Sequence, residues 1–158
     1  MSDIRRKAIA GLKIGDTFSV ERTFTEQDVI QFADISKDYN PVHFNKGFAK
    51  VKKFDACVSH GLLVGSLVTE IGGQLGWLAS GMSFEFKKPV YFGETIRCKL
   101  TIIEINEQGR AKAIAVFTNE KDTIILEAVL KGIVPGDKER KIMKGMQTGG
   151  DPERATLI

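Results

Sequence analysis

The 158-residue sequence contains few of the residues that build disulfide frameworks, metal sites and membrane spans. Its two cysteines, Cys57 and Cys98, are far apart and in no CxxC pattern, which favours reduced thiols in a cytosolic protein. With only two histidines and neither HExxH nor a paired CxxC motif, we expect no zinc site. No apolar run reaches the roughly 18 residues that a membrane span needs. The charged N-terminus lacks the apolar segment of a signal peptide, so no membrane partner is expected.

A strong charge of either sign is also missing from this chain. The formal net charge is +3 and there is no arginine-rich stripe or RNA-binding signature, so we expect no nucleic-acid partner. With 42% hydrophobic and 27% charged residues, the composition is typical of an ordinary globular protein. We predict a single domain over residues 1–136, followed by a charged, flexible C-terminal tail over residues 137–158.

The pattern of apolar residues predicts more strands than helices. Residues 1–12 are expected to be a loose lead-in, and a helical stripe after the N-cap candidate Thr25 predicts a helix over residues 26–36. Alternating apolar and polar residues predict strands over residues 17–24, 82–86, 95–105, 111–118 and 123–134. Because short turns join the later strands, we expect an antiparallel sheet.

A segment that is apolar nearly all round predicts a buried helix over residues 61–75, with Gly76 as its C-terminal stop. This helix is rich in glycine and therefore weak by propensity, so packing must hold it. It is the one segment long and apolar enough to cover the sheet, which predicts an α+β fold with a long antiparallel sheet around a central helix. Gly61, at the start of the helix, would present a backbone N–H to an oxyanion.

The segment Asp38-Tyr39-Asn40-Pro41-Val42-His43 holds a carboxylate, an amide and an imidazole within six residues. Pro41 fixes its own φ and disfavours helix at Asn40, so the segment is a rigid turn that can hold Asp38 near His43. A carboxylate and a histidine directed at one water would form a general acid–base pair. On local chemistry alone an alternative is equally good, with Asp38 as a turn or cap residue and His43 as a half-buried packing histidine.

Residues 44–54 form a lysine-rich passage with Lys46, Lys50, Lys52 and Lys53. A solvated face is the commoner explanation of such a run. The alternative is a surface that attracts the phosphates of a large anionic ligand, which would assist encounter more than it fixes geometry.

Three segments in order carry a family resemblance. They are FADISKDYNPVH at residues 32–43, SHGLL at residues 59–63 and FEFKKPVYFGET at residues 84–95. Together they resemble the MaoC-like, (R)-specific enoyl-CoA hydratases of hot-dog fold, over about residues 24–134. The sequence departs from the family pattern at Lys37, Asn45 and Glu94, none of which is Asp38 or His43.

The resemblance implies reversible hydration of a trans-2-enoyl thioester carried by CoA or by acyl carrier protein, with no metal or redox cofactor. It implies Asp38 and His43 as the catalytic dyad and Asn40 as a residue that holds the loop or the dyad. The Gly61 amide would face the thioester oxygen.

Two further positions on or near the helix follow from the same resemblance. Ser66 resembles a helix serine that lines the site in family members, although a serine that bonds back to its own helix is the commoner case. Thr69, about one turn further, is a rival for this role. His60 is expected to cap or pack rather than catalyse.

Two other functions are compatible with this fold. Thioester hydrolysis needs a carboxylate that activates water towards the carbonyl carbon, and Glu70 is the only obvious one on the long helix. A non-catalytic module would bind acyl thioesters without turnover, and the intact Asp38 and His43 pair counts against it. Because an open sheet edge invites pairing and family members join their sheets, we expect a homodimer or a dimer of dimers.

Overall fold

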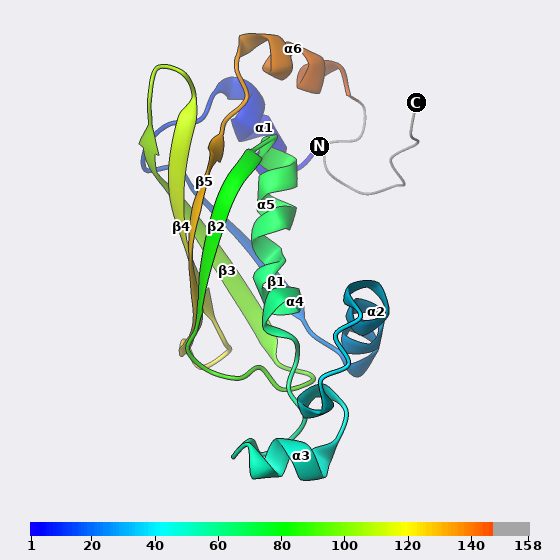
Figure 1. Cartoon of the computed structure of the whole chain (residues 1–158). Helices are drawn as coiled ribbons and strands as arrows, with labels where there is room; N and C mark the ends of the chain where they lie inside the picture. Colours follow the sequence, from blue (N-terminus) through cyan, green and yellow to red (C-terminus); the bar gives the residue numbers. More distant parts are fainter. Residues whose placement is uncertain (147–158) are drawn as a thin grey trace.

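Five antiparallel strands form one curved sheet in the computed structural model, which describes residues 1–146 (Figure 1). The strands lie in the order β1-β3-β4-β5-β2. Their bounds are β1 Thr17–Thr23, β2 Leu78–Phe86, β3 Thr95–Ile105, β4 Arg110–Thr118 and β5 Ile124–Ile133. The predicted strands are confirmed with small shifts at their ends, of which the largest is that β2 begins at Leu78.

Six α-helices and one short 3-10 turn accompany the sheet in the described residues. They are α1 Asp3–Ala10, α2 Glu26–Ser36, η1 Pro41–His43, α3 Lys46–Val51, α4 Gly61–Gly65, α5 Leu67–Leu75 and α6 Asp137–Gly145. The helix predicted over residues 26–36 has the bounds of α2, because Thr25 accepts from Asp28 N and Asp28 accepts from Thr25 N in a capping box. None of the described helices is long and apolar enough to cross a membrane.

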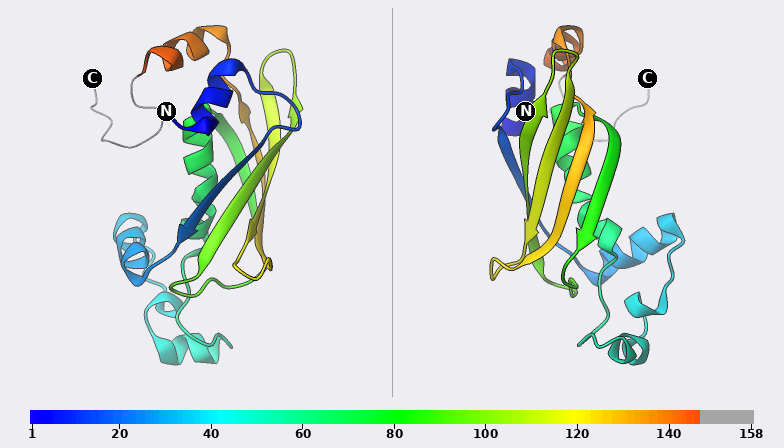
Figure 2. Two further views of the ribbon diagram at one scale, coloured as in Figure 1. Left: turned by 180° about the vertical axis from the view of Figure 1, so that it is seen from behind. Right: turned by 60° about the vertical axis from the view of Figure 1, so that its left-hand side comes forward.

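The central helix lies along one face of the sheet as two consecutive segments, α4 and α5 (Figures 1 and 2). Leu67, Val68, Ile71 and Leu75 are buried from this column into the core that it forms with the strands. This confirms the α+β fold in which an antiparallel sheet wraps around an apolar helix. The opposite face of the sheet carries no helix in the described part of the chain (Figure 2).

The single helix predicted over residues 61–75 is interrupted at one residue, Ser66. Its hydroxyl donates to the Leu63 carbonyl at 2.6 Å, and the Thr69 hydroxyl donates to the Ser66 carbonyl at 2.7 Å. Such bonds from side chains to the preceding turn compete with the helical ladder and bend helices. The column ends where predicted, because Gly76 takes the left-handed φ of 69°.

Two predictions for the chain ends differ from the structure. The lead-in forms helix α1, whose N-cap Ser2 accepts from Arg5 N, and whose Arg5 guanidinium donates to the Gly73 carbonyl of α5 at 3.0 Å. Residues 137–145 of the predicted flexible tail form helix α6, which buries Met143. A short amphipathic helix with one buried anchor has too weak a pattern to be read from sequence. The rest of that predicted tail, residues 147–158, lies outside the described residues.

Residues 24–60 leave the end of β1, form α2, η1 and α3, and return to the start of α4 (Figure 1). The returning segment is fixed to the sheet side of the molecule by a bridge between Val58 and Tyr91 and by the Ser59 N–H, which donates to the Val90 carbonyl at 2.8 Å. This excursion brings the Asp38–His43 turn to the N-terminal end of the central column.

Candidate functional site

The Asp38–His43 turn is built by consecutive side-chain caps. Asp38 Oδ1 accepts from the Asn40 N–H at 3.1 Å, and Asn40 Oδ1 accepts from the Val42 N–H at 3.2 Å. Pro41 is the first residue of η1, where its missing N–H costs nothing. Lys37 ends α2 with φ 61°, a left-handed conformation that suits glycine best. The local sequence therefore fixes the turn, and the Asn40 side chain caps it at Val42.

His43 is buried, and one of its ring nitrogens has a protein partner. Its Nδ1 lies 2.7 Å from the Val58 carbonyl oxygen. Because a carbonyl only accepts, Nδ1 carries the hydrogen and Nε2 keeps its lone pair. Nε2 lies 3.9 Å from Asp38 Oδ2, and the Asp38 side chain is 50% exposed. This separation is too long for a direct hydrogen bond, but a single water about 2.8 Å from each atom would span it.

Burial lowers the pKa of His43 below its ordinary value of 6.5. The hydrogen bond to the Val58 carbonyl and the Asp38 carboxylate act in the opposite direction, while the neighbouring His60 adds to the lowering. His43 is therefore neutral near pH 7, and its Nε2 can accept a proton from a water molecule.

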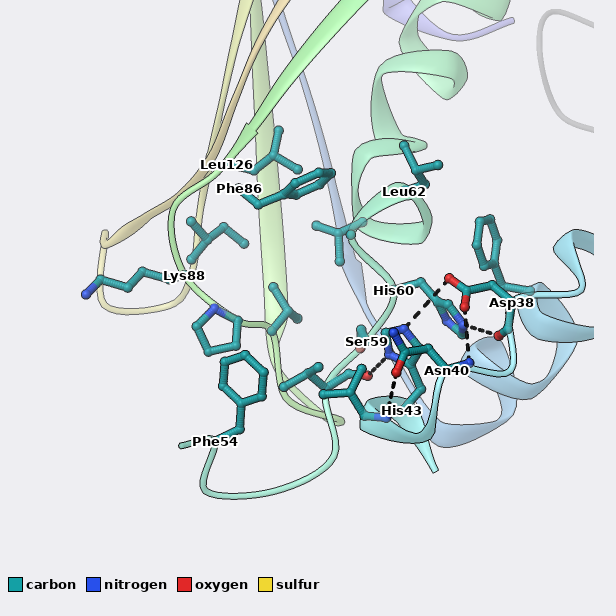
Figure 3. A pocket seen from close by; sticks show the side chains of 18 of the residues that line it. Asp38, Asn40, His43, Phe54, Ser59, His60, Leu62, Phe86, Lys88 and Leu126 are labelled. Atoms are coloured by element: carbon teal, nitrogen blue, oxygen red, sulfur yellow. Dashed lines mark hydrogen bonds and ion pairs between the residues drawn. The ribbon is translucent and has the colours of Figure 1, made fainter. Parts of the chain in front are cut away.

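His60 lies directly against His43. The two imidazole rings stack with their centroids 3.7 Å apart, and the His60 Nε2 lies 2.9 Å from the Asp38 carbonyl oxygen (Figure 3). His60 makes no side-chain cap on α4, and its ring packs against His43 instead. The sequence alone gave no sign that it contacts both members of the candidate pair.

Gly61 is the first residue of α4, so its N–H has no acceptor within the helix. The Phe86 ring packs on its Cα, and a Cβ at this position would lie 2.5 Å from Phe86 Cε1. A side chain here would therefore force the ring to move. This contact, rather than backbone conformation, is the reason that glycine fits position 61.

Asp38, Asn40, His43 and Gly61 all line one cavity of about 680 Å³. The labelled side chains of Figure 3 show Asp38 and His43 at one side of it and Phe54 with Lys88 at the other. Between them the walls are mainly apolar, formed by Val58, Leu62, Val64, Phe86, Val90 and Leu126. The cavity can hold a mostly apolar ligand beside one polar, proton-transferring end.

Ser66 is the one predicted site residue that the structure does not bring to this cavity. It lines a separate cavity of about 390 Å³, together with Thr69, Glu70 and Arg22. Its hydroxyl is used by the Leu63 carbonyl, which is the commoner behaviour of a helix serine. Glu70 is also engaged, because its carboxylate pairs with the Arg22 guanidinium at 2.5 Å.

Asp38, His43 and His60 have ligand atoms within 4.8 Å of one another, the only such metal-type cluster in residues 1–146. Both imidazoles, however, use one nitrogen for a backbone carbonyl. The two rings are also stacked and inclined by only 29°, so their planes are nearly parallel. A metal ion binds a ring nitrogen in the plane of the imidazole, and one ion cannot lie in the plane of both rings. The donor set suits proton transfer better than metal coordination.

Comparison with known proteins gives consistent results. A family model described as "MaoC like domain" matches residues 12–125. The (R)-specific enoyl-CoA hydratase of Aeromonas caviae is 31% identical over 111 residues, which cover 68% of this chain and 81% of that protein. The mitochondrial 3-hydroxyacyl-[acyl-carrier-protein] dehydratase of Arabidopsis thaliana is 28% identical over 130 residues, 78% of each chain.

Solved structures agree with the sequence comparisons. The (R)-hydratase from A. caviae involved in PHA biosynthesis superposes with a TM-score of 0.73 at 25% identity, covering 79% of this chain and 98% of that one. The ChsH1-ChsH2 complex from Mycobacterium tuberculosis gives a TM-score of 0.70 at 14% identity, covering 78% and 98%, a likeness of fold alone.

Proposed function

The chain belongs to the MaoC-like domain family, and we propose that it is a hydro-lyase that reversibly adds water to trans-2-enoyl thioesters to give (3R)-3-hydroxyacyl thioesters. The observation that carries this proposal is the 3.9 Å separation of Asp38 Oδ2 and His43 Nε2 beside an apolar cavity. Its relatives carry hydratase and dehydratase names, which supports the same chemistry.

The separation of Asp38 and His43 suits one bound water. The carboxylate and the neutral imidazole both accept hydrogen bonds, so a water between them would donate both of its hydrogens. A lone pair on the water oxygen then points away from the pair, towards the substrate C3. Two acceptors on one water thus both increase its nucleophilicity and orient it.

The proposed reaction needs only the two protons of the water, one of which the dyad transfers to C2. As the water oxygen bonds to C3, a proton passes to the dyad, for which the His43 Nε2 lone pair is the stronger candidate. The C2–C3 π electrons move towards C2 and the thioester oxygen, which forms an enolate. A proton from the dyad then returns to C2, so the product has gained one hydrogen and one hydroxyl. General acid–base help of this kind contributes roughly 10²–10⁴-fold.

The enolate oxygen needs a donor, and the Gly61 N–H is our candidate. It opens α4 beside the two catalytic side chains and has no acceptor within the helix. By analogy with the oxyanion holes of acyl-transfer enzymes, one such donor contributes about 3–4 kcal/mol to the transition state.

The rival functions are less well supported by these contacts. Glu70, the candidate base for thioester hydrolysis, is paired with Arg22 and lines a different cavity from Asp38 and His43. A module that only binds thioesters does not need a buried, neutral histidine 3.9 Å from a carboxylate, a spacing that fits one bridging water. Neither alternative has an observation that favours it.

An assay on crotonyl-CoA tests the proposed function. The purified protein is expected to remove the enoyl ultraviolet absorbance without releasing free CoA thiol. Thiol release would instead indicate a thioesterase, and binding without either signal would indicate a non-catalytic module. Running the assay over several acyl lengths on CoA and on acyl carrier protein would identify the carrier.

Activity should depend on pH through His43. Its pKa is lowered by burial, so the acid limb of kcat/KM is expected below pH 6.5, with full activity retained above it.

The stability of the fold should also decrease at acid pH because of His43. The unfolded histidine binds a proton more readily than the folded one, so the free energy of unfolding falls as pH drops below 6.5 and is unaffected above it. Thermal midpoints of the wild type and His43→Gln across this range would measure the effect, and a midpoint that rises on acidification only in the wild type would contradict it.

A homodimer, or a dimer of dimers, is proposed from the edge of the sheet. β2 pairs only with β5, and Leu78, Met82 and Phe86 are exposed along it in the described chain. An exposed apolar edge strand favours pairing with a second copy. Because Phe86 also lines the cavity, that cavity would then lie near the subunit boundary.

Sedimentation equilibrium is expected to give at least a dimer for the wild type. Leu78 is 69% exposed on the edge strand, so Leu78→Glu should shift the equilibrium towards monomer by introducing charge there. An equally apolar change, Leu78→Ile, is the matched control. A wild type that is monomeric and fully active at all concentrations would contradict the proposal.

A cytosolic location is proposed from cysteine chemistry alone. Cys57 and Cys98 are both free and buried. Unpaired thiols favour a reducing compartment.

A further inference from the structure

His60 is the most deeply buried titratable group of the site, with 2% of its surface exposed, and the proposed mechanism gives it no proton to move. Its ring packs against other aromatic rings. His43 stacks on it at 3.7 Å between centroids, and Phe32 of α2 contacts it at 5.0 Å. It thus lies where α2, the Asp38–His43 turn and the start of α4 meet.

The hydrogen bond of His60 fixes which of its nitrogens carries a proton. Nε2 lies 2.9 Å from the Asp38 carbonyl oxygen, an obligate acceptor, so Nε2 carries the hydrogen. Nδ1 is left buried with no hydrogen-bond partner in the described part of the chain. A buried acceptor without a donor lowers stability. A phenyl ring would fill the same space without that loss, so packing alone does not account for an imidazole here.

We infer that His60 is a positioning residue, which holds Asp38 through its backbone and His43 through its ring at the spacing that fits one water. This inference rests on the proposed hydratase function. The contacts are direct on both sides, and Gly61, the proposed oxyanion donor, is the next residue in the chain. One side chain therefore connects all three parts of the site.

The electrostatic contacts of His43 identify a second effect of His60. The titratable groups that face His43 are Asp38, from its own loop, and His60, from the segment before α4. Asp34 of α2 accepts from the Tyr39 hydroxyl, Lys87 pairs with Glu85 and Glu127, and Lys88 lies on the opposite side of the cavity (Figure 3). After burial, the proximity of His60 is a further cause of the lowered pKa of His43. His60 thereby helps to keep His43 in the neutral form.

Two substitutions separate the two contacts of His60. His60→Phe keeps a stacked ring and removes the donor to the Asp38 carbonyl. His60→Gln keeps a donor and removes the stacked ring. Each is expected to lower kcat on crotonyl-CoA by roughly 10- to 100-fold, because small misplacements of reacting groups are costly. KM should change less than about threefold, since binding contacts are kept.

A structural readout does not depend on turnover. The chain has only two histidines, so NMR of ¹³C-labelled histidine gives two titration curves that single variants assign. In His60→Gln the pKa of His43 is expected to rise, and the acid limb of kcat/KM should move to higher pH with it. If the wild type does not hydrate enoyl thioesters, the proposed function fails, while this titration still tests the coupling of the two rings.

Phe117→Leu is the matched control for lost stability. Phe117 is fully buried within the sheet and does not line the cavity, so its truncation should lower the melting temperature and leave kcat unchanged. The inference is overturned if both His60 variants retain kcat within about twofold of the wild type. It is equally overturned if they lose activity only in proportion to lost folded protein, with an unchanged His43 titration.

Discussion

Asp38→Asn or His43→Gln is expected to lower kcat for crotonyl-CoA hydration by roughly 10³-fold, within the range of general acid–base catalysis. Asp38→Asn replaces the carboxylate that would hold the attacking water across the 3.9 Å gap with a neutral amide, and His43→Gln removes the imidazole nitrogen that would accept its proton. Asp38→Asn is the cleaner test, because the amide keeps an oxygen to accept from the Asn40 N–H and so preserves the turn. Circular dichroism and the melting temperature would verify that both variants are folded.

The double variant distinguishes a shared water from two independent roles. If both side chains act on one water, Asp38→Asn combined with His43→Gln should be little slower than either single variant. Asp34→Asn is the matched control. This nearby carboxylate bonds the Tyr39 hydroxyl and does not line the cavity, so activity should stay within about twofold. Multiplicative losses in the double variant, or full turnover in both single variants, would contradict the dyad.

Gly61→Pro is expected to lower kcat by roughly 10²–10³-fold relative to Gly61→Ala, when both are made in a Phe86→Ala background. Proline deletes only the N–H at the first helical position, where its ring is well tolerated. The preceding His60 has ψ 133°, an extended conformation compatible with a following proline. The Phe86→Ala change removes the ring that a new Cβ would meet at 2.5 Å.

Gly61→Ala supplies the internal control for this comparison. It keeps the backbone N–H and adds the same Cβ, so the ratio of the two variants isolates the amide. The loss should fall on kcat rather than KM, because charge develops on the thioester oxygen only in the transition state. Equal activity of the alanine and proline variants would show that the Gly61 amide does not stabilise the enolate.

Local sequence features predicted the elements that local physics controls. The bounds of α2 follow from the Thr25 and Asp28 capping box, the stop at Gly76 from its left-handed φ, and the Asp38–His43 turn from Pro41 and two side-chain caps. Alternation of apolar residues identified the long strands, and the apolar column at residues 61–75 was predicted in its full extent. These signals act within a few residues along the chain.

Several features escaped prediction because they depend on partners distant in sequence. Helices α1 and α6 are short, and each is held by contacts to residues far along the chain, such as Arg5 to Gly73. Ser66 was expected near the site, but its hydroxyl bonds back to Leu63 in a different cavity. Phe86 of the edge strand contacts Gly61 at the start of α4. The spacing of apolar residues in the sequence does not predict a contact between residues this far apart.

The sequence by itself determined the α+β architecture, the rigid turn that carries Asp38 and His43, and the family to which those residues belong. Only the tertiary structure decided that the His43 ring is held by the Val58 carbonyl, stacked on His60 and set 3.9 Å from the Asp38 carboxylate. The reason is physical. Caps and periodicity are encoded among neighbours in the chain, whereas the position of an imidazole and its pKa depend on burial and on partners that meet only when residues 24–60 fold back onto the start of the central helix.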